Sequence, residues 1–196
     1  MLHNTMDEIV KQAMAKWPNV PHCYGWLALD ARGGWRMRDE AAQRADTLGD
    51  RLAHVALIGF INRNYLHDGH GNWYFQNGPQ RVYVNLEATP FIARTDPSLG
   101  FVLQTGQALA AVEAVFMLDT GALILQAGEI VAQLDDRDMA QVLARMELGG
   151  QPASVEAIMA WLEDDAAELA LDGVKVERLS ADALQRRFGY VQAPGT

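Results

Sequence analysis

The stretch GNWYFQNGPQRVYVNLEATPFIAR, residues 71–94, decides how the chain folds. It contains three short apolar, aromatic and β-branched runs, at 73–75, 82–86 and 91–93. Asn-Gly-Pro separates the first two runs and Thr-Pro the last two. Because glycine tolerates positive φ and proline removes a ladder donor, this punctuation predicts an antiparallel meander.

Turn signals elsewhere in the chain repeat the same chemistry. An aspartate followed closely by glycine separates apolar runs at 30–34, 119–121 and 172–173, which is typical of β-hairpins. In the central stretch, side chains alternate between the two faces of a strand. One face carries Val82, Val84 and Leu86, and the other carries Arg81, Tyr83 and Asn85.

Two helices are predicted before the meander. Thr5 and Glu8 have the spacing of a capping box, and the helix they begin ends at Trp17, the residue before a proline. A second helix is predicted over 51–65, and because it is apolar nearly all round, we expect it to be largely buried against the sheet. The tail over 192–196 is expected to fray. The predicted fold class is α+β, with antiparallel sheet segments packed against helices.

The net charge of −9 belongs to one half of the chain. Residues 1–97 carry ten acidic and ten basic side chains, whereas residues 98–196 carry fifteen acidic and six basic ones. We therefore expect a neutral α+β half over 1–97 and an acidic α+β half over 98–196, which can together form one compact unit. An acidic surface repels a phosphate backbone, so nucleic-acid binding is not expected there. The charge suits a partner protein with a basic face, or solubility alone.

Composition indicates a globular protein of the cytoplasm. The longest apolar run, residues 55–61, has seven residues, far short of the roughly 20 that a helix needs to cross a bilayer. No membrane span is therefore expected. The first residues lack the basic and apolar regions of a signal peptide, and the single cysteine, Cys23, has no partner for an internal disulfide. These features favour a reducing compartment.

Four phrases of the sequence carry a resemblance to a known family. They are MAKWPNVP at 14–21, CYGWL at 23–27, WRMRDE at 35–40 and FQNGPQRVYV at 75–84. Over roughly residues 6–94 the chain resembles a family of small, uncharacterised proteobacterial proteins, a domain of unknown function. The resemblance implies a cytoplasmic bacterial protein, and it implies no activity, cofactor or catalytic residue.

The polar loop of the central hairpin is the first candidate for binding. Asn77, Gln80 and Arg81 present two amides and a guanidinium at the hairpin tip, flanked by Tyr74 and Tyr83. A guanidinium binds a carboxylate or phosphate with two parallel hydrogen bonds. The alternative interpretation is a turn with a solvated arginine on the outer face of the sheet.

Cys23 is the candidate nucleophile. A reactive thiol needs a lowered pKa and a base nearby. The adjacent His22 points to the opposite face of an extended strand, so His54, on the second helix, is the better candidate base. The alternative is that Cys23 packs as a small hydrophobic side chain.

Two further groups of side chains have the residue types of a chemical site. His67, Asp68 and His70 could hold a metal ion in a glycine-rich loop, although a hairpin connection explains the same sequence, and no metal is expected. The acidic clusters at 135–138 and 163–165 lie at predicted helix ends, where we expect the carboxylates to be solvated and structural.

The sequence therefore favours a non-catalytic cytoplasmic protein that binds a partner protein or a small ligand, without a cofactor. The alternative is a small hydrolase or transferase that uses Cys23 with a histidine, or a metal near His67 and His70. None of the common catalytic or nucleotide-binding motifs is present. Self-association through a strand edge is left open.

Overall fold

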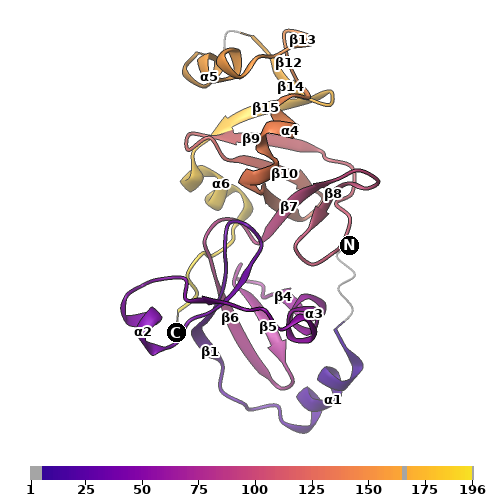
Figure 1. Ribbon diagram of the computed structural model, residues 1–196. Coiled ribbons are helices and arrows are strands. Elements are labelled where there is room, and N and C mark those ends of the chain that lie inside the picture. Colours follow the sequence, from indigo (N-terminus) through magenta and orange to yellow (C-terminus); the bar gives the residue numbers. More distant parts are fainter. Residues whose placement is uncertain (1–5, 165–166, 196) are drawn as a thin grey trace. The chain divides into compact units, whose positions relative to one another are not determined.

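The computed structural model, which describes residues 6–164 and 167–195, shows an α+β protein with two mixed sheets (Figure 1). Unit 1 comprises the described residues up to Pro90, together with Gln104–Gly106 and the C-terminal residues from Gly189. Unit 2 comprises the described residues of Phe91–Leu103 and Gln107–Phe188. The predicted fold class is confirmed, and a division into two domains at residues 97 and 98 stays a prediction.

Unit 1 is built on a six-stranded sheet. Its strands, in spatial order, are β3 (Asp50–Arg51), β2 (Trp35–Met37), β1 (Cys23–Leu29), β6 (Gln80–Leu86), β5 (Trp73–Asn77) and β4 (Tyr65–His67). Its helices are α1 (Glu8–Lys16), α2 (Glu40–Arg44) and α3 (Val55–Arg63). The pairs β1–β2, β5–β6 and β4–β5 are antiparallel, whereas β1 and β6 run parallel.

The hairpin turn at residues 30–34 forms as the sequence predicts. The Asp30 carboxylate accepts hydrogen bonds from the Gly34 amide at 2.7 Å and the Arg32 amide at 3.0 Å. Arg36 Nε donates to the same carboxylate at 2.6 Å. An aspartate in a turn thus satisfies the amides that the strand ladder leaves without partners.

The predicted meander differs from the observed one in its third strand. The strand that pairs with β5 on its far side is β4, and the chain after β6 enters β7 (Phe91–Asp96) of the second sheet. The physical reason lies at Pro90, which has no amide to continue a ladder. Its carbonyl instead accepts hydrogen bonds within unit 1, from the Tyr65 hydroxyl at 2.9 Å and from Gln104 Nε2 at 3.3 Å.

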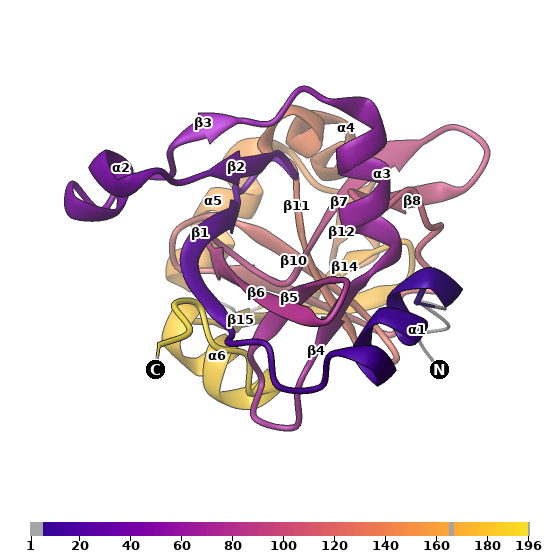
Figure 2. The same ribbon diagram turned by 90° about the horizontal axis from the view of Figure 1, so that it is seen from below.

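Helix α3 covers one face of this sheet, as Figure 2 shows. The Phe60 and Phe75 rings meet edge to face at 5.3 Å, and Trp35 Nε1 donates to Asn62 Oδ1 at 2.7 Å. The predicted burial of the helix is wrong, because Val55 is 82% exposed and only Ile61 of α3 is buried. The helix is one layer on the sheet, so its far side is open to solvent.

Helix α1 runs over Glu8–Lys16, with Asp7 as its N-cap residue and Trp17 as its C-cap residue. It ends where predicted, but it starts two residues later than a cap at Thr5 would place it. Thr5 of the predicted capping box lies outside the described residues. Arg63 Nε, at the end of α3, pairs with Asp7 Oδ1 at 3.2 Å. The Asp7 amide also donates to Asn64 Oδ1 at 2.9 Å, which fixes the start of α1 to the end of α3.

The C-terminal residues return to unit 1 and are held there. The Leu86 amide donates to the Gln192 carbonyl at 2.7 Å, and the Val191 amide donates to the Gly71 carbonyl at 2.9 Å. Gly71 has a φ of 81°, and a Cβ there would lie 1.8 Å from the Gly189 carbonyl oxygen. The expectation that the tail frays from residue 192 is therefore wrong for Gln192, and Thr196 lies outside the described residues.

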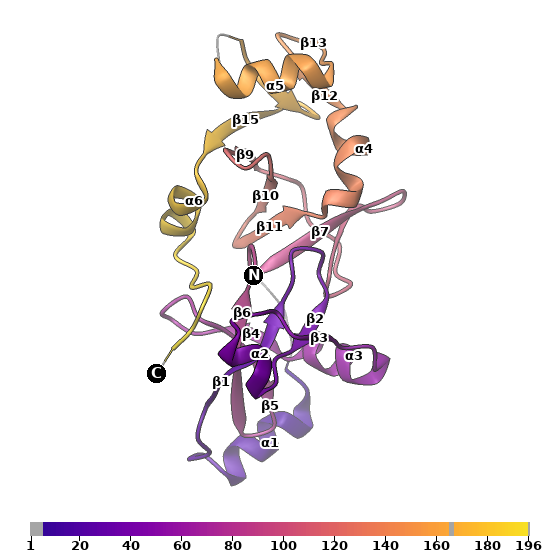
Figure 3. The ribbon, with the colours of Figure 1, turned by 60° about the vertical axis from the view of Figure 1, so that its left-hand side comes forward.

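Unit 2 is built on a nine-stranded mixed sheet. Its strands, in spatial order, are β13 (Gln151–Pro152), β12 (Met146–Leu148), β14 (Leu169–Leu171), β15 (Val174–Leu179), β9 (Ala114–Leu118), β10 (Leu123–Ala127), β11 (Ile130–Leu134), β7 and β8 (Gly100–Leu103). Its helices are η1 (Asp136–Asp138), α4 (Met139–Leu143), α5 (Val155–Glu163) and α6 (Ala181–Phe188). Figure 3 labels α4, α5 and α6. The predicted turns at 119–121 and 172–173 join β9 to β10 and β14 to β15. No helix of the described residues is long and apolar enough to span a membrane.

Candidate functional site

Three tyrosines from adjacent strands form a cluster on the face of the unit 1 sheet opposite α3. Tyr74 on β5 is directly opposite Tyr83 on β6, and their rings meet edge to face at 5.7 Å. Tyr24 on β1 stacks on Tyr83 with the ring centroids 4.6 Å apart and 3° between the ring planes. The pairing of β1 with β6 shifts register around Gly25, which has a φ of 80°. A bulge of this kind changes where a side chain points.

Arg81 completes the outer layer of the cluster. It is two residues before Tyr83 on β6, so both side chains lie on the same face. Its guanidinium carbon lies 4.5 Å from the centroid of the Tyr74 ring, which is cation–π geometry. Desolvation acts to lower the pKa of Arg81, but a hydrogen bond with Tyr83 and the nearby Asp68 charge outweigh it and raise the pKa. Arg81 is therefore a fixed, permanent cation.

Asp68, in the turn between β4 and β5, holds the other side of Tyr83. Its Oδ1 accepts hydrogen bonds from the His70 amide at 2.8 Å and the Asn72 amide at 3.0 Å. Its Oδ2 accepts from Asn72 Nδ2 at 3.1 Å and from the Tyr83 hydroxyl at 3.4 Å. Desolvation acts to raise the pKa of Asp68, but these hydrogen bonds outweigh it and lower the pKa. The carboxylate is thus committed to the turn and to Tyr83.

We name Tyr24, Tyr74, Tyr83, Arg81 and Asp68 the tyrosine–Arg81 site. Tyr74 and Tyr83 are only 6% and 5% exposed, whereas Tyr24 and Arg81 are partly exposed. A molecule that approaches this face therefore meets a phenol ring and a guanidinium. Among the ion pairs of the described residues, none involves Arg81. The arrangement can stack on a planar group and bind an anion.

The structure brings together some of the polar residues predicted at the hairpin and not others. Arg81 and Tyr83 lie on one face in the tyrosine–Arg81 site. Asn77 and Gln80 form the last pair of the β5–β6 ladder, and alternation places them on the opposite face from Arg81. Gln80 Nε2 donates to the Pro21 carbonyl at 3.0 Å, so this amide ties the segment before β1 to the hairpin.

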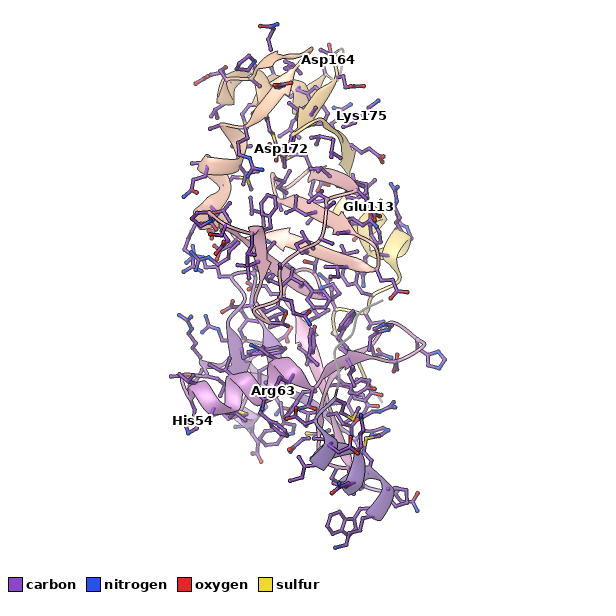
Figure 4. The ribbon with its side chains drawn as sticks, turned by 90° about the vertical axis from the view of Figure 1, so that its right-hand side faces the viewer. His54, Arg63, Glu113, Asp164, Asp172 and Lys175 are labelled. Carbon is purple, nitrogen blue, oxygen red and sulfur yellow. The ribbon has the colours of Figure 1, made fainter. Side chains whose placement is uncertain are left out.

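Cys23 lies at the start of strand β1, and His54 lies at the start of helix α3. Burial raises the pKa of the Cys23 thiol, which is the opposite of what activates a nucleophile. His54 is the N-cap residue of α3, and its Nδ1 accepts a hydrogen bond from the Leu57 amide at 3.2 Å. Figure 4 shows His54 and Arg63 at the two ends of this helix. His54 thus has a role in stabilising the helix start.

The loop with His67, Asp68 and His70 uses its polar atoms for internal contacts. The His67 ring lies 4.9 Å from the Trp73 ring, and its Nδ1 is 3.0 Å from the Asp68 carbonyl oxygen. His70 contributes its backbone amide to the Asp68 carboxylate. The described residues contain no group of three or more His, Cys, Asp or Glu side chains that could hold a metal ion.

The acidic cluster at 135–138 is not solvated as predicted. Asp135 is fully buried and Asp138 is 5% exposed. Arg137 Nε donates to both oxygens of Asp135, and Asp138 Oδ2 accepts from the Thr95 amide at 2.8 Å. Arg94 Nε lies 3.7 Å from Asp135 and 3.6 Å from Asp138. The carboxylates are buried because arginine and backbone donors compensate their charge. In the second cluster, Asp165 lies outside the described residues.

The sequence predicts Tyr74 beside the polar loop, but it does not predict Tyr24 as part of the site. Tyr74 and Gln76 lie on the same face of β5, and the strand pairing places Tyr74 on the face of its ladder partner Tyr83. This alternation is the sequence signal for the position of Tyr74. No local signal reveals Tyr24, since its place depends on the parallel pairing of β1 with β6 and on the bulge at Gly25.

With its two mixed sheets and its helices, the chain has an α+β fold. It belongs to the family DUF2944, described as "Protein of unknown function (DUF2946)", whose model matches residues 6–195. The resemblance expected from the sequence is therefore confirmed. A search of the curated proteins gave no match.

Two solved structures are similar to the chain. A DUF1285 family protein from Silicibacter pomeroyi DSS-3 is 14% identical, with a TM-score of 0.50 over 92% of this chain and 91% of that one. A DUF1285 family protein from Shewanella baltica OS155 is 12% identical, with a TM-score of 0.41 over 59% of this chain and 88% of that one. The first likeness concerns the fold, and neither description names an activity.

Proposed function

We propose that the protein is a non-catalytic binding protein and that its tyrosine–Arg81 site binds a small anionic ligand. The observation that carries the proposal is the state of Arg81. Its guanidinium is stacked on Tyr74 and linked to Tyr83, yet it forms no ion pair within the described residues. A guanidinium with a ring on one face and no ion-pair partner offers the parallel donors that a carboxylate or phosphate takes.

The neighbouring rings support a ligand that is aromatic as well as anionic. Tyr24 stacks on Tyr83 with one side of its ring, and its side chain is partly exposed. A planar group gains offset stacking on such a ring, which is worth about 0.5–1.5 kcal/mol. An aryl carboxylate or aryl phosphate therefore uses both parts of the site, and inorganic phosphate uses only Arg81.

Two observations favour binding over catalysis. Burial raises the pKa of Cys23, which keeps the thiol protonated at neutral pH. His54 Nδ1 accepts a hydrogen bond from the Leu57 amide, so that nitrogen serves the helix start. The alternative, a hydrolase or transferase, would need a Cys23 thiol with a lowered pKa and a His54 ring nitrogen that can act as its base. The single cysteine and the family resemblance support a bacterial cytoplasmic location for this function.

The test is isothermal titration calorimetry of the full chain with phenyl phosphate, benzoate, inorganic phosphate and acetate. We expect the aryl anions to bind more tightly than their non-aromatic counterparts. Arg81→Gln is expected to weaken aryl-anion binding about tenfold or more, because it removes a charge-assisted donor pair. The matched control is Arg187→Gln, which removes another arginine that lies over an aromatic ring. Equal affinities for the chain and its Arg81→Gln variant would contradict the proposal.

A second candidate function is suggested by charge. Unit 2 carries the whole net charge of −9, with sixteen acidic and seven basic side chains, whereas unit 1 has nine of each. We propose that the acidic unit binds a protein partner with a basic face, since complementary potentials steer association. Capture of the partner on immobilised chain should fall steeply with ionic strength. Partner capture that does not depend on salt would oppose it.

A further inference from the structure

Helix α5 of unit 2 is fixed by local contacts on one of its sides. Ser154 is its N-cap residue, and its hydroxyl accepts a hydrogen bond from the Ala157 amide at 3.2 Å. Ile158 and Trp161 are buried, and Trp161 Nε1 donates to the Ala167 carbonyl at 2.9 Å. These contacts hold one side of the helix, and the helix lies beside β12 and β13 (Figure 3).

The other side of α5 exposes apolar side chains. Val155 is 55% exposed and Met159 is 59% exposed. They are four residues apart, and Leu162, which is partly exposed, follows Met159 by three. Such spacing places all three on one stripe of a helix. The buried side chains Ile158 and Trp161 lie on a different arc, so the exposed stripe is additional to the core-facing one.

Acidic side chains border this stripe. Glu156, next to Val155, and Glu163, four residues after Met159, are exposed. Asp164, which Figure 4 labels, follows the last turn of the helix. Within the described residues, no ion pair involves any of these three acidic side chains. From residue 151 to residue 172 the sequence contains six acidic and no basic side chains.

A cation of β15 contacts the C-terminal turn of α5. Arg178 NH1 donates to the Leu162 carbonyl at 2.8 Å, and its guanidinium carbon lies 5.8 Å from the centroid of the Trp161 ring. Arg178 thus lies over the buried Trp161 ring. The exposed arc combines an apolar stripe with carboxylates that form no ion pair within the described residues.

We infer that this arc, the α5 surface of Val155, Met159, Leu162, Glu156 and Glu163, is the docking site for a basic amphipathic helix of a partner protein. This inference rests on the second proposed function, the basic partner, and names the surface that the partner uses. An apolar stripe takes the apolar face of the incoming helix, and the flanking carboxylates pair with its lysine or arginine side chains.

Charge decides among the possible occupants of the α5 surface. A second copy of the chain would bring an identical acidic helix, so that like charges would face each other across the interface. An anionic lipid surface attracts basic segments and would repel this one. Only a basic partner gains from both the stripe and its borders.

The test measures fluorescence anisotropy of a labelled synthetic amphipathic peptide of leucine and lysine on addition of the full chain. The first variant is the double substitution Val155→Thr with Met159→Gln, and the second is Glu156→Gln with Glu163→Gln. The control is Leu99→Gln, which alters an apolar side chain of unit 2 that is 53% exposed. All these side chains are on the surface, and circular dichroism with thermal unfolding confirms that each variant is folded.

We expect the parent chain to bind the peptide with an affinity that falls as salt rises. The first variant should bind about tenfold more weakly, because it removes the central apolar anchors. The second should bind several-fold more weakly with a smaller salt dependence. Leu99→Gln should change the affinity less than about twofold.

Three results would overturn the inference, in distinguishable ways. Salt-dependent binding that is equal in the parent and the first variant would leave the basic-partner proposal intact and place the site elsewhere on unit 2. An absence of binding by the parent chain would overturn both. Self-association of the parent chain, or binding to anionic vesicles, that the first variant abolishes would assign the surface to a different occupant.

Discussion

Arg81 in unit 1 and Arg187 in unit 2 both lie over an aromatic ring, and they differ in what their N–H edges contact. The guanidinium of Arg81 lies 4.5 Å from the centroid of Tyr74, and that of Arg187 lies 4.7 Å from the centroid of Phe116. Arg187 NH1 donates to Glu177 Oε2 at 3.0 Å. Arg145 repeats the pattern of Arg187, over Phe101 and paired with Asp172.

This difference separates a structural arginine from a candidate binding group. In unit 2 the ring and the carboxylate together complete the interactions of the guanidinium. In unit 1 the ring and the Tyr83 hydroxyl fix Arg81, while no carboxylate of the described residues pairs with it. A guanidinium that a ring holds in place and that forms no ion pair can take an anionic ligand, because binding costs little further ordering.

The largest expected effect concerns the ion pair of the buried Asp135 with Arg137 in unit 2. Asp135→Ala should lower the free energy of unfolding by about 3 kcal/mol, because a buried acceptor of hydrogen bonds from Arg137 is lost. Chemical denaturation measures the change. The control Glu129→Ala removes an exposed carboxylate and should cost less than about 0.5 kcal/mol. Equal losses of unfolding free energy in the two variants would show that the Asp135–Arg137 pair does not stabilise unit 2.

A smaller effect is expected at the ion pair of Asp30 with Arg36 in unit 1. Asp30→Asn should lower the free energy of unfolding by about 2 kcal/mol at neutral pH, because the carboxylate accepts charge-assisted hydrogen bonds from Gly34 and Arg36. Asp119→Asn, at an exposed hairpin aspartate of unit 2, is the control and should cost less than about 0.5 kcal/mol.

The pH dependence of the Asp30 effect follows from its pKa. Desolvation acts to raise the pKa of Asp30, but hydrogen bonds from Gly34, Arg36 and Arg32 outweigh it and lower the pKa. A lowered folded-state pKa contributes stability that is present above the unfolded value of about 3.9 and is lost as pH falls through the folded value. The difference between parent and Asp30→Asn should therefore shrink in acid. A difference that grows below pH 4 would contradict this account.

The link between Arg81 and Asp68 is expected to matter more for binding than for folding. Tyr83→Phe should lower the free energy of unfolding by about 1 kcal/mol or less, since its hydroxyl bond to Asp68 is 3.4 Å long. The same change should weaken aryl-anion binding several-fold, because Arg81 loses the hydroxyl that orients it. Calorimetry and denaturation on one sample measure both. A loss of stability without a loss of affinity would remove Tyr83 from the site.

The smallest expected effect contrasts the two stacked arginines directly. Arg81→Gln should change the free energy of unfolding by about 0.5 kcal/mol, the contribution of an exposed cation–π contact. Arg187→Gln should cost about 1 kcal/mol, because it also breaks the pair with Glu177. Chemical denaturation of both variants in low salt compares them. The order of the two values is the prediction, and a larger cost at Arg81 would reverse the comparison.

The sequence predicts the local structure of the chain better than its long-range pairing. The hairpins at 30–34 and 119–121 form because Asp and Gly supply the turn geometry within a few residues. The parallel pairing of β1 with β6 and the assignment of β7 to the second sheet depend on residues far apart in the chain. Turn residues do not encode such partners.

For the same reason, the sequence predicts only part of the candidate site. Arg81 and Tyr83 are neighbours on one strand, so alternation alone places them together. Tyr24 reaches Tyr83 only through the bulge at Gly25, and the Asp68 contact depends on the folded turn between β4 and β5. The exposure of α3 also escaped prediction, because apolar composition does not specify how many layers cover a helix.

The most direct measurement is nuclear magnetic resonance of the arginine Nε–H groups during titration with phenyl phosphate. The account predicts that the Arg81 Nε–H resonance moves and saturates, because the anion accepts its N–H donors, while the Arg187 resonance stays in place beside Glu177. An Arg81 resonance that does not move at saturating phenyl phosphate, or equal movement of both resonances, would contradict the claim that Arg81 is the anion-binding group.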